Sequence, residues 1–103
     1  MQHEEASFLA VDIRDHPDPF EVAIFGEIDI TNVDQIVALA THSWNGHGTV
    51  VFDISGLTFV GSTGLRAFNI VAVSANKFRC VHGSAIVERV LRISGLDTWL
   101  DES

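Results

Sequence analysis

Basic residues are scarce in this sequence, which has 6 Lys and Arg against 14 Asp and Glu and a net charge of −8 at pH 7. Nucleic acids and anionic membrane surfaces are bound through clusters of basic side chains. We therefore expect neither of them as a partner. Proline is scarce too: both prolines lie in the stretch Asp15–Pro19, which predicts a turn between two strands.

Cysteine is nearly absent. The single Cys80 cannot form a disulfide within the chain, which suits a reducing compartment, and we expect this residue to be buried and inert. The chain begins with the polar, acidic stretch Met1–Glu5 rather than with a signal peptide. No apolar run approaches the ~20 residues of a transmembrane helix. These absences predict a cytoplasmic domain that does not enter a membrane.

The sequence does contain an alternation of apolar strands and amphipathic helices. Hydrophobic residues make up 47% of it and charged residues 19%, which is typical of a globular domain. We expect one domain over residues 1–103, with its core in about residues 7–97. Strands are predicted at 7–13, 20–28, 49–54 and 78–82, and helices are predicted to start near Thr31, Ser62 and Ala85. This order predicts an α/β fold, a mixed sheet of four to five strands with helices packed over it.

The most informative segment is Thr58–Leu65, which reads Thr-Phe-Val-Gly-Ser-Thr-Gly-Leu. It follows the strand Thr49–Ile54, which is apolar on both faces like a central strand covered by helices, and it opens an apolar helix. The hydroxyls of Ser62 and Thr63 then lie at a helix N-terminus, where unpaired N–H groups and the helix dipole stabilise a phosphate. The alternative interpretation is that Ser62 is simply the N-cap of that helix.

Three stretches of the chain occur in the order and spacing of a known family. The first is Val-Val-Phe-Asp at 50–53, followed by Gly-Leu-Thr-Phe-Val at 56–60 and Ser-Thr-Gly-Leu at 62–65. The second is Gly-Glu-Ile-Asp at 26–29, which leads into a helix, and the third is Val87–Asp97, a helix with its exit turn. From about Phe8 to Asp97 the chain thereby resembles the STAS domain. That family includes bacterial anti-sigma-factor antagonists and the cytoplasmic tails of sulfate transporters.

This resemblance implies a binding protein that is not an enzyme. Such antagonists dock on an anti-sigma factor, which is often also the serine kinase, and so release a sigma factor; phosphorylation blocks docking. The family's phosphoacceptor maps onto Ser62, with Thr63 as the less favoured alternative. Gly61 replaces the family's usual Asp, which leaves the hydroxyl in place but removes a charged neighbour. ATP and magnesium belong to the kinase, so no cofactor is expected.

The predicted helix after Ser62 has two different faces. Leu65, Phe68 and Val71 fall on one broad apolar stripe, which predicts the side packed on the core. Ile70 lies nearly opposite the middle of that stripe, with Arg66 and Val73 beside it. An apolar residue on an outer face beside a switch indicates a docking surface. The predicted partner-binding residues are Asp29, Gly61, Ser62, Thr63, Arg66, Ile70 and Val73.

Two other functions compete with this hypothesis. Gly56–Thr63 has the glycine spacing of a phosphate-binding P-loop, the only support for a nucleotide-sensing module, but Ser62 stands in the place of the lysine. Gly61 supports the other, a STAS interaction module that is never phosphorylated. Catalytic residues are not predicted, because Gly61–Gly64 does not fit a nucleophile elbow. A metal site is not predicted either, because the five histidines are scattered.

Overall fold

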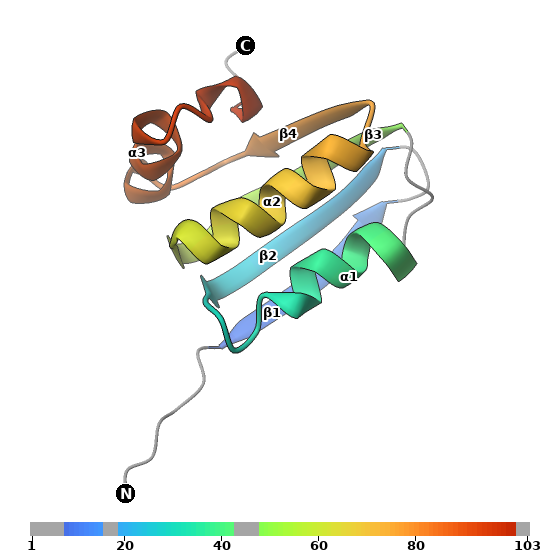
Figure 1. Cartoon of the computed structure of the whole chain (residues 1–103), viewed down its shortest axis with the longest axis horizontal. Helices are drawn as coiled ribbons and strands as arrows, with labels where there is room; N and C mark the ends of the chain where they lie inside the picture. Colours follow the sequence, from blue (N-terminus) through green and yellow to red (C-terminus); the bar gives the residue numbers. More distant parts are fainter. Residues whose placement is uncertain (1–7, 16–18, 43–47, 101–103) are drawn as a thin grey trace, which may run out of the picture.

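A computed structural model describes residues 8–15, 19–42 and 48–100 of the chain (Figure 1). Its elements follow one another as β1 (Leu9–Asp15), β2 (Phe20–Ile28), α1 (Asp34–His42), β3 (Thr49–Val60), α2 (Ser62–Ser74), β4 (Lys77–Val81), α3 (Ala85–Ile93) and the 3-10 turn η1 (Asp97–Trp99). The four strands form one sheet in the order β1-β2-β3-β4. β1 runs antiparallel to β2, whereas β2, β3 and β4 are parallel. The predicted α/β fold with a mixed sheet is confirmed; residues 16–18 of the predicted turn lie outside the described residues.

α1 and α2 cover one face of the sheet, and α3 lies beyond its β4 edge (Figure 1). The crossovers from β2 to β3 and from β3 to β4 each move to the next strand in the same direction. Because such crossovers are right-handed, α1 and α2 lie side by side on the same face. The apolar pattern of Thr49–Ile54 predicted cover on both faces, but in the described part of the chain no helix lies on the other one. Val51 and Asp53 point to that other face and are nevertheless buried.

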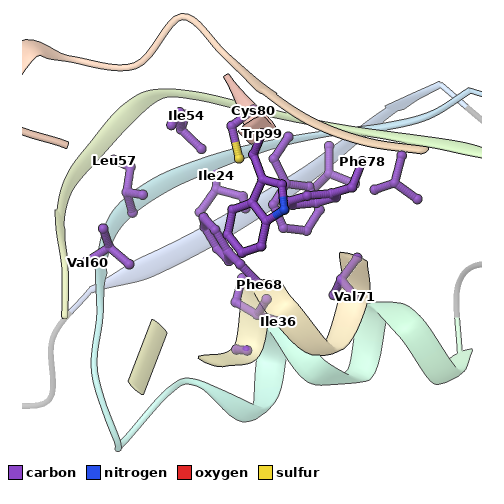
Figure 2. Packing of buried hydrophobic residues seen from close by; sticks show 14 of the residues in the cluster. Ile24, Ile36, Ile54, Leu57, Val60, Phe68, Val71, Phe78, Cys80 and Trp99 are labelled. Atoms are coloured by element: carbon purple, nitrogen blue, oxygen red, sulfur yellow. The ribbon is translucent and has the colours of Figure 1, made fainter. Parts of the chain in front are cut away.

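Aromatic rings fill the centre of the core, between α2, the sheet and η1 (Figure 2). Phe52 of β3 packs edge-to-face on Phe68 of α2 and on Phe78 of β4, with ring centroids 5.1 and 5.0 Å apart. Cys80 belongs to the same cluster, and its predicted burial is confirmed. Burial raises the pKa of the Cys80 thiol to about 12, so the reactive thiolate does not form at neutral pH.

The core continues past Asp97, where the sequence predicted its end. Trp99 and Leu100 are 9% and 7% exposed and belong to the core cluster. Trp99 packs edge-on against Phe78 at 5.1 Å, and Leu100 forms a bridge with Cys80 alongside β4. The segment after α3 therefore closes the core at the β4 edge of the sheet.

An ion pair crosses the face of the sheet that the described helices leave open. Arg14 Nη1 donates to Asp53 Oδ2 at 3.2 Å, so the guanidinium reaches from β1 over β2 to β3. Burial alone raises the pKa of Asp53, but hydrogen bonds from Ser55 and the nearby charges of His82 and Arg14 outweigh it and hold the pKa below its ordinary value. This carboxylate therefore stabilises the fold above the unfolded-state pKa of Asp, and that contribution is lost as the pH falls through the folded pKa.

Candidate functional site

β3 is longer than the sequence predicted, because it continues from Ile54 to Val60. The added part pairs with β2: Gly56 lies opposite Phe25, and Val60 lies opposite Ile28. A P-loop curls around a phosphate with consecutive backbone N–H groups turned inward, whereas Gly56–Val60 are extended strand residues paired with β2. The P-loop interpretation of Gly56–Thr63 is therefore wrong, and the nucleotide-sensing hypothesis loses its only support.

Ser62 is the first residue of α2, and one residue, Gly61, separates it from the end of β3. The N-cap of this helix is Gly61, so the interpretation of Ser62 as the cap is wrong. Ser62 is exposed and Thr63 is half-buried. The Ser62 hydroxyl makes no hydrogen bond with any residue that the structure describes. It is therefore open to solvent at the end of the helix where the backbone dipole is positive.

The turn between β2 and α1 is held together by polar side chains. Asn32 is only 6% exposed, its Nδ2 donates to the Glu27 carbonyl at 2.9 Å, and its Oδ1 accepts from the Asp29 N–H at 3.0 Å. Asp29 Oδ1 accepts from the backbone N–H and the hydroxyl of Thr31, at 2.9 and 2.6 Å. The helix predicted to start near Thr31 therefore begins three residues later, at Asp34, and Thr31 belongs to the turn before it.

The sequence analysis did not identify two exposed apolar residues at the edge of the sheet where β2 and β3 end. Ile30, in the turn after β2, is 80% exposed, and Phe59, near the end of β3, is 52% exposed. A Cβ atom at Gly61 would lie 3.3 Å from the Phe59 ring, so the ring rests beside the start of α2. Apolar side chains at the carboxyl ends of neighbouring parallel strands were a readable signal, because those ends meet at one edge of a sheet.

The backbone conformation at position 61 does not require a glycine. Its φ is −99°, an extended value that residues other than glycine adopt readily. Among the described residues, only the Phe59 ring would lie within 4 Å of a Cβ atom at position 61, and this exposed ring has room to move by a few tenths of an ångström. An aspartate is therefore compatible with this fold at position 61. The fold does not require glycine there, and the replacement leaves the site without a carboxylate beside Ser62.

The outer face of α2 adjoins Ser62. Gly64, Ala67, Phe68 and Val71 are the buried residues of the helix. On the other side Arg66 is exposed, Ile70 is 44% exposed and Val73 is 76% exposed. The predicted exposure of these three residues is confirmed. Together with Ser62 they recur every three to four residues, so they form one stripe along the helix. We call Ser62, Arg66, Ile70 and Val73 the α2 stripe.

A family model described as "STAS domain" matches residues 10–102. The chain belongs to the STAS domain family. No curated protein sequence matches it.

Solved structures share the fold at low sequence identity. The anti-sigma factor antagonist SpoIIAA in its unphosphorylated form is 23% identical, with a TM-score of 0.69 over 91% of this chain and 88% of that one. An anti-sigma factor antagonist from Mycobacterium paratuberculosis is 22% identical, with a TM-score of 0.74 over 93% of this chain and 87% of that one. The Bacillus cell fate determinant SpoIIAA in the phosphorylated form is 23% identical, with a TM-score of 0.60 over 91% of each chain. These likenesses show the fold of the STAS domain.

The Ser-Thr-Gly-Leu start of α2 in this STAS domain depends on close packing at Gly64. A Cβ atom there would lie 2.6 Å from Val60 Cγ2 and 3.1 Å from Ile28 Cγ2, well inside ordinary contact distance. The first turn of α2 thus rests directly on the paired ends of β2 and β3. This contact fixes the start of α2, and with it the exposed Ser62, at the carboxyl ends of these two strands.

Replacing Gly64 by alanine should lower the free energy of unfolding by about 1–3 kcal/mol, because the added methyl group overpacks the contact with Val60. Urea unfolding followed by circular dichroism measures this. The matched control is Asn69→Ala at an exposed position of the same helix, which should change stability by about 0.5 kcal/mol or less. Equal effects of the two substitutions would contradict close packing at Gly64.

The described residues contain no group of three or more His, Cys, Asp or Glu side chains placed to hold a metal ion. Within the same ranges, no helix has the length and apolar character needed to cross a membrane. The STAS domain offers instead an exposed hydroxyl, two apolar side chains at one sheet edge and an exposed helix stripe. Such a surface is suited to binding another protein.

Proposed function

We propose that this STAS domain is an anti-sigma-factor antagonist in the cytoplasm, which docks on an anti-sigma factor and so releases a sigma factor. The observation that supports this most is the exposed Ser62 hydroxyl at the start of a helix whose outer stripe carries Ile70 and Val73. The similar fold of anti-sigma factor antagonists, one of them solved in a phosphorylated form, agrees with it. The chain needs neither a cofactor nor catalysis for this role.

The docking surface that we propose comprises the α2 stripe and the adjoining edge of the sheet, where Ile30 and Phe59 are exposed. Gly61 and Thr63 flank Ser62 within it. Asp29 contributes by shaping the β2–α1 turn, since its carboxylate accepts two hydrogen bonds from Thr31. That turn presents Ile30 to the partner.

Phosphorylation of Ser62, by the anti-sigma factor or another serine kinase, is the proposed switch. A phosphoserine adds roughly −1.5 to −2 charge, and docking would have to strip water from it. The side chain of Ser62 lies one turn from Arg66 and two turns from Ile70, so this charge would fall within the contact. Unmodified protein docks, and phosphorylated protein does not.

Incubation with the cognate kinase, followed by mass spectrometry, should find phosphate on Ser62 and not on Thr63, because Ser62 is the more exposed hydroxyl. Ser62→Ala should lose the modification, whereas Thr63→Val should keep it. Phosphate on Thr63 alone would show that the proposed acceptor is wrong.

A STAS interaction module without a phosphorylation switch is the second candidate. Gly61 favours it, because this fold accommodates an aspartate at position 61 and the chain nevertheless lacks that carboxylate. Docking on an anti-sigma factor with no modification of Ser62 by that factor or by other cellular kinases would establish this function instead.

A further inference from the structure

We infer that Arg66 binds the phosphate carried by Ser62, forming an ion pair along the outer face of α2. This inference rests on the proposed phosphorylation of Ser62 and concerns what that phosphate then does. Ser62 and Arg66 are four residues apart in one helix, and both are exposed. Side chains at this spacing are neighbours on a helix surface, with Cβ atoms about 5–6 Å apart.

The chain already contains a pair of this kind. In α3, Glu88 and Arg92 have the same spacing and the same order of charge, and Glu88 Oε1 lies 4.0 Å from Arg92 Nη2. Phosphoserine has as many bonds between its Cα atom and its terminal oxygens as glutamate has. A phosphate on Ser62 can therefore reach Arg66 as the Glu88 carboxylate reaches Arg92, and it carries more charge.

Arg66 is available for this pairing. It forms no ion pair with any residue that the structure describes, and Gly61 brings no carboxylate to compete for it. Guanidinium groups bind phosphate oxygens through parallel N–H donors, and an acidic group on the N-terminal side of a basic one is the favourable order along a helix. The position of the hydroxyl and the charge of Arg66 thus fit each other.

The consequence is that phosphorylation changes the docking surface in two ways. It adds negative charge, and it engages Arg66 within the chain. In the unmodified protein the same guanidinium is free to pair with a carboxylate, so we expect an Asp or Glu of the partner opposite Arg66. Phosphorylation of Ser62 thereby adds a charge that must be desolvated on docking, and it also removes the contact between Arg66 and the partner's carboxylate.

The test measures the second ionisation of the phosphate, with phosphoserine installed at position 62 during synthesis of the full chain. A neighbouring cation stabilises the dianion and lowers this pKa. Phosphorus NMR titration should therefore give a pKa that rises by about 0.3, a twofold change in proton affinity, when Arg66 is replaced by glutamine. The matched control is Arg89→Gln, which removes one exposed positive charge from α3.

A rise in the phosphate pKa with Arg66→Gln but not with Arg89→Gln supports the inference. Equal pKa values in the two variants overturn it, because Arg66 then does no more than another exposed positive charge of the chain. Neither result depends on a kinase or on the anti-sigma factor. Failure of the proposed phosphorylation would appear separately, in the mass spectrometry of the kinase reaction.

Discussion

Replacing Ile70 by aspartate should weaken docking on the anti-sigma factor by at least about 2 kcal/mol, roughly 30-fold in Kd. Ile70 lies in the middle of the α2 stripe and is 44% exposed, so in the complex its outer half would lose its contact with water. An aspartate there places an unpaired charge in a desolvated contact. Stability should fall by only about 1 kcal/mol, since nearly half of the side chain is already exposed to solvent in the free protein.

Titration calorimetry on the purified pair measures the affinity, and thermal unfolding of the variant alone verifies that it is folded. The matched control is Ile93→Asp, which makes the same change at a 76% exposed isoleucine on α3. The control should dock normally. If both variants lose the same affinity, the effect is one of charge alone; if Ile70→Asp docks normally, the α2 stripe is not the docking surface.

Replacing Trp99 by alanine should lower the free energy of unfolding by about 3–5 kcal/mol. The indole packs edge-on against Phe78 at 5.1 Å and lies 6.3 Å from Phe68, ring centroid to ring centroid. Removing it opens a cavity in the aromatic cluster at the β4 edge of the sheet. Because small domains are stable by only about 5–15 kcal/mol, the loss is a large part of the total.

Urea unfolding followed by far-ultraviolet circular dichroism measures this loss without using tryptophan emission. Thr98→Ala is the matched control, because its side chain is exposed in the same turn and its loss should cost about 0.5 kcal/mol or less. If the two variants were equally stable, the segment after Asp97 would not be part of the core.

The faces of α2 were predictable from the sequence. Apolar residues at helical spacing, such as Phe68 and Val71, identify the buried side, and this leaves Ile70 on the outside whatever the helix packs against. The start of the helix near Ser62 was predictable too, because glycine and hydroxyl residues follow an apolar strand there. The spacing of apolar residues is a local property of the sequence, and it predicts the buried face correctly when the helix packs on one side only.

The extent of β3 was not predictable in the same way. Ser55 and Gly56 indicate a loop by their own preferences, and the segment continues as strand because β2 lies alongside and pairs with Gly56, Leu57, Phe59 and Val60. The packing of Gly64 on Val60 and Ile28 likewise depends on where three elements meet. Both contacts involve residues of β2 that lie far away in the sequence, so no local pattern indicates them.

The sequence by itself determined the order of the elements, the buried Cys80 and the place of the Ser62 hydroxyl at a helix start, because each follows from local pattern and composition. Only the tertiary structure decided that β3 continues along β2 as far as Val60, that Gly64 packs on Ile28, and that Trp99 closes the core. The physical reason is that these features are pairings between segments distant in the chain, whose partners no local pattern specifies.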